Sequence, residues 1–423
     1  MSKGPKAIIV VCDSLRRDLL GSATPTLRKF AETATSFVSH RAIFPSATRV
    51  TSASIATGCT PGRHGLHGNM MALDDGEGPV AYSVGKPDFV DRLRKMTGRT
   101  LRCPTLAERV SDRGRAVIFS NVSPGAAYFQ DPNGFGYVYH RAGSFGPGRV
   151  RLPDEQGLAI SSGVAGDREM TERFCRHLRS REFSLLSVLW QSEPDWTAHH
   201  HPLGSPTHLA AIRSADDNVE RVLNAVRLAS VSEDELLMVI CSDHGNETIR
   251  RQIDVNKELA KAGFKAEASS RDIVAASQGT AALIYFSRPA LQKAADVVAY
   301  LNDQDWAGAV YAGEDLRKIG MEPEGGLWIA ISMAASDGKN SFGVTGFSDL
   351  AVNPEYAEDV RGFGNHGGLG PNESQRPFLM IKGPGFAPGE VRSEPTSPLD
   401  IAPTVLRHLG LEVSGMDGMA LQQ

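Results

Sequence analysis

The sequence predicts an α/β fold, in which a doubly wound, mostly parallel sheet is flanked by helices and carries a smaller inserted α+β subdomain. The first observation is a set of short, unbroken apolar runs, which are typical of strands buried on both faces of a parallel sheet. The second is that helix-like segments alternate with these runs, which favours a doubly wound arrangement. The third is that the alternation is interrupted, and the interruptions predict long loops and an insertion.

The predicted strands are rich in β-branched residues and end in polar or glycine-rich turns. They cover residues 7–11, 116–120, 183–190 and 236–242. The helix-like segments cover residues 24–34, 105–114, 167–181 and 208–229. Alternation of this kind predicts strands joined through helices that cover both faces of one sheet.

Three segments depart from this alternation and define the predicted domain organisation. Residues 70–104 and 124–165 are rich in Gly, Pro and Asp, so we expect long loops near the strand ends that determine substrate specificity. Residues 265–345 mix strand-like and helix-like runs and predict the small inserted α+β subdomain. The catalytic core then consists of residues 1–264 and 346–423.

The composition is that of an ordinary soluble globular protein, with 41% hydrophobic and 22% charged residues. The net charge of −4 gives no support for binding to a nucleic-acid polymer or to a membrane surface. No stretch approaches the ~20 apolar residues that a membrane span requires. The first apolar run leads directly into Asp13 without a small-residue cleavage site, so a cytoplasmic location is expected.

The cysteines do not predict a disulfide framework. There are five of them, they are widely spaced, and no two form a CxxC pair. Buried structural thiols are therefore favoured over a disulfide scaffold. For the oligomeric state the sequence offers only the common default, a homodimer.

Four clusters of Asp and His fall after predicted strands or between glycines, where open α/β sheets place their ligand sites. The members are Asp13, the i,i+4 pair Asp195 and His199, the tandem Asp243 and His244, and His366. Each cluster alone has a structural alternative, such as a helix cap. Together they supply three carboxylates and three imidazoles, an oxygen and nitrogen mixture that Zn²⁺ accepts and that Mn²⁺ or Fe²⁺ could also use.

A segment rich in small hydroxyl residues begins at Thr48. Thr48 could begin a helix whose N-terminal N–H groups and dipole favour an anion, although a simple helix cap explains the segment equally well. The next residue, Arg49, has two interpretations. It is either a solvated or structural cation, or a bidentate partner for a second anionic group on a substrate.

These residues, in this order, resemble the alkaline phosphatase superfamily, and within it the nucleotide pyrophosphatase/phosphodiesterase branch. The resemblance extends from residue 7 to about residue 405 and rests on five motifs. They are Asp13 after the first strand, Thr48 before the Thr57-Gly58 pair, the PDxxxH segment with Asp195 and His199, the SDHG segment from Ser242 to Gly245, and His366-Gly367. Each motif alone is weak, but the ordered set is specific.

The resemblance implies a site with two Zn²⁺ ions and a threonine nucleophile. One zinc would be held by Asp13, Thr48, Asp243 and His244, and the other by Asp195, His199 and His366. Thr48 would attack the phosphorus of a small-molecule phosphoester, most readily a phosphodiester, and form a phospho-enzyme. Asn69, in the HGN element, would contact a phosphoryl oxygen.

Other functions fit parts of the sequence. The HGN element and residues 101–110 also resemble phosphonoacetate hydrolases, which cleave a C–P bond in a phosphonate, but residues 120–131 lack the lysines that those enzymes use. A phosphomonoesterase or a zinc-stabilised binding protein without turnover would carry the same ligands. A sulfatase is disfavoured because Thr48, Val50 and Ser52 stand where its nucleophile, Pro and Arg belong. A dinucleotide-binding dehydrogenase is disfavoured because no GxGxxG follows the first strand.

Overall fold

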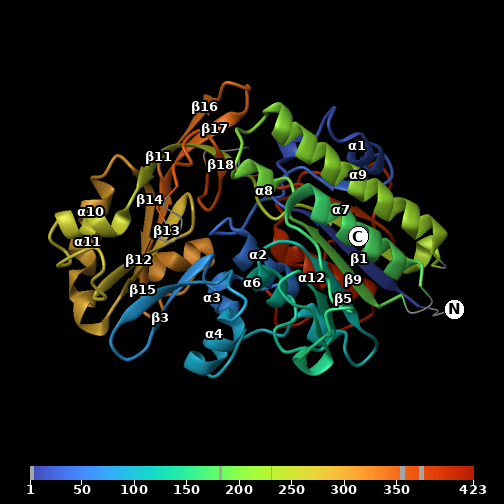
Figure 1. The fold of residues 1–423 in the computed structure, drawn as a ribbon, viewed down its shortest axis with the longest axis horizontal. Coiled ribbons are helices and arrows are strands. Elements are labelled where there is room, and N and C mark those ends of the chain that lie inside the picture. Colours follow the sequence, from blue (N-terminus) through green and yellow to red (C-terminus); the bar gives the residue numbers. More distant parts are fainter. Residues whose placement is uncertain (1–3, 181–182, 230, 353–357, 371–375) are drawn as a thin grey trace.

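The computed structural model describes residues 4–180, 183–229, 231–352, 358–370 and 376–423. Within these residues the chain forms two lobes that lie side by side (Figure 1). The main lobe is built on a sheet of ten described strands, in the order β20-β2-β19-β10-β1-β9-β5-β6-β7-β8. The second lobe, residues 247–365, carries two sheets of four described strands each.

The centre of the main sheet is parallel. The parallel strands are β10 (Leu236–Cys241), β1 (Lys6–Cys12), β9 (Leu186–Gln191), β5 (Ala116–Ser120) and β6 (Tyr137–Tyr139). An antiparallel strand, β19 (Leu379–Lys382), pairs with β10 and extends the sheet on one side. The edges are completed by β2 (Thr35–Phe37), β20 (Val391–Arg392), β7 (Phe145–Gly146) and β8 (Val150–Arg151).

Helices cover both faces of this sheet because its strands are apolar on both faces. In β1, Ala7, Ile9 and Val11 face one core, whereas Ile8, Val10 and Cys12 face the other. One face packs against α1 (Pro25–Ala31), α7 (Gly163–Leu178) and α9 (Pro206–Leu228). The other packs against α2 (Thr48–Thr57), α4 (Phe89–Thr97), α5 (Leu106–Arg109), α6 (Pro124–Tyr128) and α12 (Ile401–His408). The predicted fold class is confirmed.

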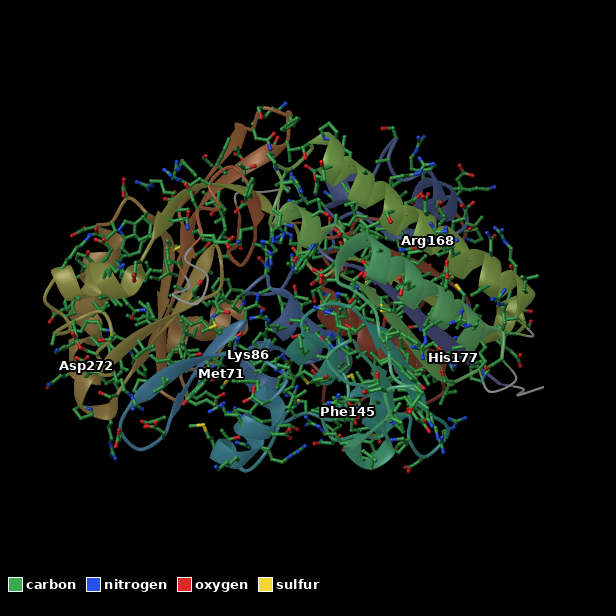
Figure 2. All side chains as sticks on the ribbon, in the orientation of Figure 1. Met71, Lys86, Phe145, Arg168, His177 and Asp272 are labelled. Atoms are coloured by element: carbon green, nitrogen blue, oxygen red, sulfur yellow. The ribbon has the colours of Figure 1, made fainter. Side chains whose placement is uncertain are left out.

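The side chains divide between the core and the surface of the molecule (Figure 2). The residues that α7 buries share one helix face, whereas Arg168 projects from the opposite face. Four of the five cysteines are buried and all are free thiols. No helix among the described residues is both long and apolar enough to span a bilayer.

The second lobe is organised around an antiparallel sheet. Its strands are β12 (Ile273–Ser277), β13 (Ala281–Phe286), β15 (Leu327–Met333) and β14 (Ala307–Ala312). α10 (Val255–Lys261) and α11 (Ala294–Asn302) pack on one face of it. The other sheet joins β16 (Ala335–Lys339), β17 (Thr345–Ala351), β11 (Glu247–Ile253) and β18 (Gly364–Asn365). The lobe thus extends beyond the predicted 265–345 segment on both sides.

The segments 70–104 and 124–165, predicted as loops, contain regular structure. The first holds the hairpin of β3 (Met70–Asp74) and β4 (Pro79–Ser83) as well as α4, and the second holds α6 and β6 to β8. Glycine and proline mark the turns of these elements, while Met70 and Ala72 are buried against Tyr285 of the second lobe. The predicted helix at 105–114 is also short, since α5 ends at Arg109.

Short connections complete the described chain. The remaining α-helical turns are α3 (Pro61–His64) and α8 (Asp195–Ala198). The 3-10 turns are η1 (Arg17–Leu19), η2 (Pro147–Arg149), η3 (Glu233–Glu235), η4 (Arg288–Lys293), η5 (Gly313–Ile319) and η6 (Pro398–Asp400). Of these, α8 matters most for the site, because it begins at one of the predicted ligands.

Candidate metal centre

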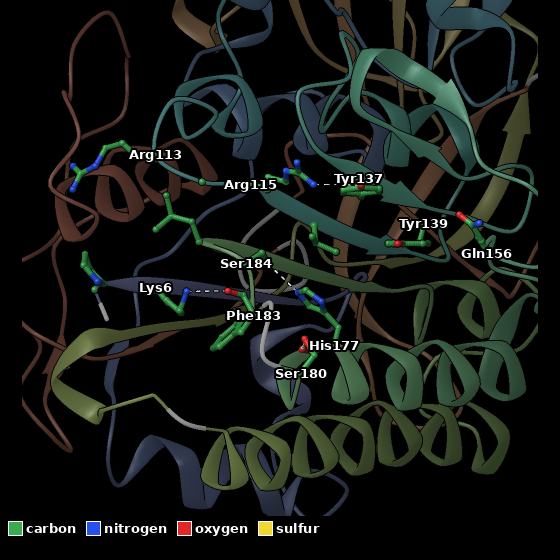
Figure 3. A pocket seen from close by; sticks show the side chains of 15 residues that line it. Lys6, Arg113, Arg115, Tyr137, Tyr139, Gln156, His177, Ser180, Phe183 and Ser184 are labelled. Carbon is green, nitrogen blue, oxygen red and sulfur yellow. Dashed lines mark hydrogen bonds between the residues drawn. The ribbon is translucent and has the colours of Figure 1, made fainter. Parts of the chain in front are cut away.

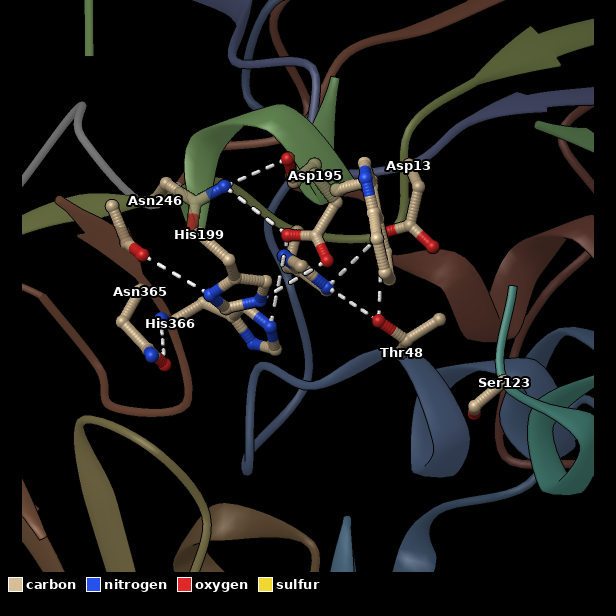
Figure 4. A network of polar contacts seen from close by, with 12 residues as sticks. Asp13, Thr48, Ser123, Asp195, His199, Asn246, Asn365 and His366 are labelled. Atoms are coloured by element: carbon tan, nitrogen blue, oxygen red, sulfur yellow. Dashed lines mark hydrogen bonds and ion pairs between the residues drawn. The ribbon is translucent and has the colours of Figure 1, made fainter. Parts of the chain in front are cut away.

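The predicted ligands of the main lobe meet at the carboxyl ends of its parallel strands. Asp13 directly follows β1, Asp243 and His244 follow β10, and Asp195 opens α8 just beyond β9. Parallel neighbours end at the same edge of a sheet, which is where open α/β folds place their ligands. Residues that are far apart in the sequence are therefore neighbours at this edge (Figure 4).

A first group of side chains surrounds His244. Its Nε2 atom lies 3.0 Å from Thr48 Oγ1, 3.4 Å from Asp13 Oδ1 and 3.2 Å from Asp243 Oδ2. Thr48 is the first residue of α2, and its hydroxyl is 3.4 Å from Asp13 Oδ1. All four side chains are buried. The structure thus brings together the residues predicted for one cation.

A second group surrounds Asp195. Its Oδ2 lies 3.2 Å from His199 Nε2, and its Oδ1 lies 3.8 Å from His366 Nε2. His366 follows β18, and its ring stacks on that of His244 with the centroids 3.8 Å apart. Ligand atoms of Asp195, His199 and His366 all lie within 4.8 Å of one another, and so do those of Asp13, Asp195 and His244. Asp195 is therefore shared between the two groups.

Backbone carbonyls fix the orientation of the three imidazoles. The Nδ1 atoms of His199, His244 and His366 lie 3.1, 3.0 and 2.9 Å from the carbonyl oxygens of Gly364, Gly245 and Ser46. A carbonyl oxygen only accepts, so each neutral ring carries its proton on Nδ1 and leaves the Nε2 lone pair exposed. A bond from the second ring nitrogen to a carbonyl is the usual arrangement for histidines that hold a metal, and here each remaining Nε2 faces a carboxylate.

The electrostatics of the site fit a cation. Burial lowers the pKa of His244 to about 4 and that of His366 to about 3, so both rings are neutral at pH 7. Burial also raises the pKa of Asp243 to about 7 and that of Asp13 well above its usual range. For His199, burial opposes the charged form, but the adjacent Asp195 carboxylate outweighs it and raises the pKa.

The environment of one carboxylate oxygen of Asp243 indicates that the site requires a cation. Among the described residues, Asp243 Oδ2 is buried without a hydrogen-bond partner, and it faces the lone pair of a neutral imidazole. A buried carboxylate oxygen in that position is costly unless a positive charge stabilises it. The nitrogen and oxygen donors fit Zn²⁺ or a similar divalent ion.

Three residues that the sequence did not single out hold the ligands in place. Trp190 Nε1 donates to Asp13 Oδ2 at 3.0 Å, the Ser14 backbone N–H donates to Asp243 Oδ1 at 3.0 Å, and Asn246 Nδ2 donates to Asp195 Oδ1 at 3.3 Å. Each bond orients a carboxylate toward the imidazoles. The available signals were the position of Asn246 next to the SDHG segment and a Trp at the end of an apolar strand.

Asn69 and Arg49 form a connected unit beside Thr48. The Arg49 backbone N–H donates to Asn69 Oδ1 at 3.2 Å, and Arg49 Nη1 donates to the Asn69 carbonyl at 2.7 Å. Arg49 Nε donates to Ser123 Oγ at 3.2 Å, and a Cβ on Gly85 would lie 2.6 Å from the guanidinium carbon. With its oxygen occupied, the Asn69 amide can donate through Nδ2. These contacts favour the structural interpretation of Arg49.

A cavity outside the candidate site lies at the amino ends of β1, β5 and β9. It has a volume of about 730 Å³, and its lining includes Lys6, Arg115, Tyr137 and His177 (Figure 3). Lys6 Nζ donates a hydrogen bond to the Phe183 carbonyl at 2.9 Å, so the ammonium group already has a partner within the protein. Within the described residues, the lining contains none of the predicted ligands. The chemistry of the side chains, and not this cavity, therefore locates the candidate site.

Comparison with known proteins decides the family. The sequence model of type I phosphodiesterase / nucleotide pyrophosphatase matches residues 7–319. The chain belongs to this family. It is therefore a phosphoester hydrolase, and the resemblance of its motifs is confirmed at the family level. The search of curated proteins found no match.

Solved structures share the whole fold. Murine ectonucleotide pyrophosphatase / phosphodiesterase 5 superposes with a TM-score of 0.69 at 17% identity, over 98% of this chain and 97% of its own. An inactive threonine-to-alanine variant of that murine protein, in complex with AMP, gives 0.69 at 16% identity and the same coverage. The human protein gives 0.68 at 17%, again over 98% and 97% of the two chains. At this identity the likeness establishes the fold.

Family membership and side-chain groups together support metal-dependent catalysis, with two groups of candidate ligands. The identity and number of the metal ions, the nucleophile and the substrate go beyond these findings. The cytoplasmic location and the homodimer stay predictions.

Proposed function

We propose that this phosphoester hydrolase is a di-zinc phosphodiesterase that uses Thr48 as its nucleophile. The observation that carries the proposal is the position of the Thr48 hydroxyl, 3.0 Å from His244 Nε2 and 3.4 Å from Asp13 Oδ1. Further support comes from the murine relative, whose threonine-to-alanine variant is inactive and was solved with AMP.

Two Zn²⁺ ions would be held by the two ligand groups. Asp13, Thr48, Asp243 and His244 would hold one, and Asp195, His199 and His366 the other. When bound, the ions supply Lewis-acid chemistry that lowers the pKa of a coordinated hydroxyl and neutralises phosphoryl charge. The four positive charges are balanced by three carboxylates and the Thr48 alkoxide, so an incoming phosphate anion meets no net repulsion.

Thr48 then performs a double displacement. Its deprotonated oxygen attacks the phosphorus, the bond from phosphorus to the leaving oxygen breaks, and that oxygen departs and takes up a proton. The product on the enzyme is a phosphate ester of Thr48 that still carries the other ester group of the substrate. Water attacks the same phosphorus in the second step, the bond from Thr48 Oγ1 to phosphorus breaks, and the hydroxyl is restored. Passing through a covalent ester divides one difficult substitution into two easier ones.

The start of α2 and Asn69 would stabilise the charge on the phosphoryl oxygens. The residue before the helix is Ala47, which provides no side-chain cap, although the Arg49 N–H of the first turn is bonded to Asn69 Oδ1. Such N–H groups favour an anion. Asn69 adds a donor through Nδ2, because its Oδ1 is held by the Arg49 N–H. Donors fixed before the reaction need no reorganisation when charge develops.

A substrate screen of the zinc-loaded protein tests the proposal. Bis-p-nitrophenyl phosphate, p-nitrophenyl phosphate, a nucleotide diester, phosphonoacetate and an aryl sulfate would be compared. We expect the diesters to be preferred. Preference for the aryl sulfate, or activity on phosphonoacetate alone, would contradict the assignment.

Thr48→Ala provides the matched mutational test. We expect diester hydrolysis to fall by roughly 10³-fold or more while bound zinc, measured by mass spectrometry, is retained. Thr51→Ala is the control, because Thr51 is a buried threonine in the same helix whose hydroxyl has no partner among the described residues. A Thr48→Ala variant that hydrolyses diesters as fast as Thr51→Ala would exclude Thr48 as the nucleophile.

A further inference from the structure

The turn between β12 and β13 brings the second lobe into contact with the candidate site. It is a tight turn, closed by a hydrogen bond of 2.8 Å from the Gln278 N–H to the Ala281 carbonyl. Gly279 has φ of 81°, a left-handed conformation that favours glycine. The turn lies about 200 residues from Asn69 and about 90 from His366 in the sequence, yet it touches the segments that carry both.

The side chain of Gln278 is bonded to the backbone at Asn69. It is 1% exposed, and its Oε1 accepts from the N–H groups of Asn69 at 2.6 Å and Met70 at 3.3 Å. Its Nε2 donates to the Met70 carbonyl at 2.6 Å. A Cβ on Gly68 would lie 2.0 Å from Gln278 Oε1, so the Gln278 amide can come this close to the backbone only because residue 68 is glycine. The amide thus fixes the backbone from which the Asn69 side chain projects.

The backbone of the same turn is bonded to His366. The Thr280 N–H donates to the His366 carbonyl at 2.7 Å. A Cβ on Gly367 would lie 1.8 Å from the Gln278 carbonyl oxygen, so the two backbones are in direct contact. The next residue, Gly368, donates its N–H to Thr280 Oγ1 at 2.8 Å. The turn therefore holds His366 through its main chain, independently of the imidazole.

We propose that Gln278 is a positioning residue for hydrolysis, and that the turn it begins fixes Asn69 relative to His366. The inference rests on the proposed function, which gives Asn69 a phosphoryl contact and His366 a metal. Gln278 contacts Asn69 only through the backbone and acts on the reaction through that residue. A donor displaced by about 1 Å from its productive position costs up to 10²-fold in rate.

A double-mutant cycle between Gln278→Ala and Asn69→Ala tests this role. We expect Gln278→Ala to lower kcat for bis-p-nitrophenyl phosphate by about ten-fold or more, with zinc content unchanged. In the Asn69→Ala background the same substitution should lower kcat by less than about two-fold, because the positioned group is already gone. Equal losses in both backgrounds would overturn the proposal.

Asn256→Ala is the matched control. Asn256 Nδ2 donates to the Ala275 carbonyl at 2.9 Å and its Oδ1 accepts from the Ala275 N–H at 3.0 Å, so its side-chain amide also bonds a backbone segment, in this case β12 within the second lobe. We expect Asn256→Ala to lower the Tm but to leave kcat unchanged. A loss of kcat in this variant equal to that of Gln278→Ala would show that any weakening of the lobe suffices, and would overturn the specific role.

If the Gln278→Ala variant unfolds, Gln278→Glu provides a second test of the proposal. Burial favours the neutral acid, which retains an acceptor for the Asn69 N–H and a donor for the Met70 carbonyl. We expect it to recover most of the lost kcat, and no recovery in a folded variant would contradict the proposal. Failure of the proposed function is recognised separately, because then Thr48→Ala would remain active whatever Gln278 does.

Discussion

The two lobes contribute to the candidate site in different ways. The main lobe provides candidate metal ligands at its strand ends, such as Asp13, Asp195 and Asp243. The second lobe contacts the main chain of the segments that carry Asn69 and His366, through the Gln278 side chain and the Thr280 N–H. The difference leads us to propose that one lobe carries the chemistry while the other fixes its geometry.

Burial differs between the two ligand groups of the main lobe. The side chains of Asp13, Asp243 and His244 are at most 2% exposed, whereas those of Asp195 and His199 are 15% and 30% exposed. Charged groups buried completely depend on a partner charge more than half-buried ones do. Removing a carboxylate from the first group is therefore expected to have the largest effect.

Asp243→Asn tests the main lobe's side-chain contribution. The amide has nearly the same shape but no charge, and it presents one acceptor where the carboxylate has two. We expect the variant to lose zinc from the first group and to hydrolyse diesters roughly 10³-fold more slowly. Metal content by mass spectrometry and kcat with bis-p-nitrophenyl phosphate would be measured together.

Asp216→Asn is the control for that variant. Asp216 is also a fully buried aspartate of the main lobe, but it accepts from the backbone N–H groups of Thr26 and Leu27 at 2.9 and 2.8 Å. We expect it to lose about 1 kcal/mol of stability and no zinc. If Asp243→Asn kept its zinc as Asp216→Asn does, the main lobe would not be the source of the ligands.

Gly279→Ala tests the second lobe's main-chain contribution. A Cβ there would lie 2.1 Å from the His366 carbonyl oxygen, so His366 must move. We expect zinc affinity, measured by chelator competition, to fall by about ten-fold, because ligands outside their best geometry bind weakly. The effect should be smaller than that of removing a ligand.

Gly263→Ala separates that contact from backbone strain. Gly263 also has φ of 81°, but a Cβ there meets nothing within 4 Å. Both variants should lose about 1 kcal/mol of stability from the left-handed conformation. Only Gly279→Ala should lose zinc affinity. Equal affinity in the two variants would mean that the turn does not position His366.

The sequence predicted the side-chain ligands of the main lobe, but not the contacts of the second lobe with the segments that carry Asn69 and His366. Asp13 and Asp243 could be placed because apolar runs mark the strands and parallel strands end at one edge. His366 follows no long strand; the glycines around it made it a candidate, and the resemblance to a known family assigned it to a metal. Gln278 carried no signal, because its role depends on contacts with residues about 210 positions away. Arg49 could not be decided because both interpretations suit the same side chain.

The loop predictions failed for a related physical reason. Glycine, proline and aspartate in residues 70–104 mark turns correctly, but they do not reveal what the short strands between them bury. Met70 and Ala72 become core only against Tyr285 of the second lobe, which is far away in the sequence. Local composition therefore predicts where the turns of such a segment lie, but not which of its side chains are buried.

The smallest expected effect concerns an ion pair that joins the lobes. Arg102 Nη1 of the main lobe lies 2.5 Å from Glu324 Oε2 of the second, and the side chains are 32% and 27% exposed. Glu324→Gln should lower stability by about 0.5 kcal/mol, as is typical of partly exposed pairs. Glu322→Gln is the control, since Glu322 pairs with Arg317 inside the second lobe.

The pH dependence gives this small effect a distinct signature. Burial works to raise the pKa of Glu324, but the neighbouring His67 and Arg102 side chains outweigh it, and the net shift is downward from 4.5. A carboxyl with a lowered pKa stabilises the folded state above its unfolded pKa and loses that contribution as the pH falls through its folded value. The Tm difference between wild type and Glu324→Gln should therefore be present at pH 7 and shrink below pH 4.5. A difference that stayed constant down to pH 3 would show that packing, and not this charge, joins the lobes.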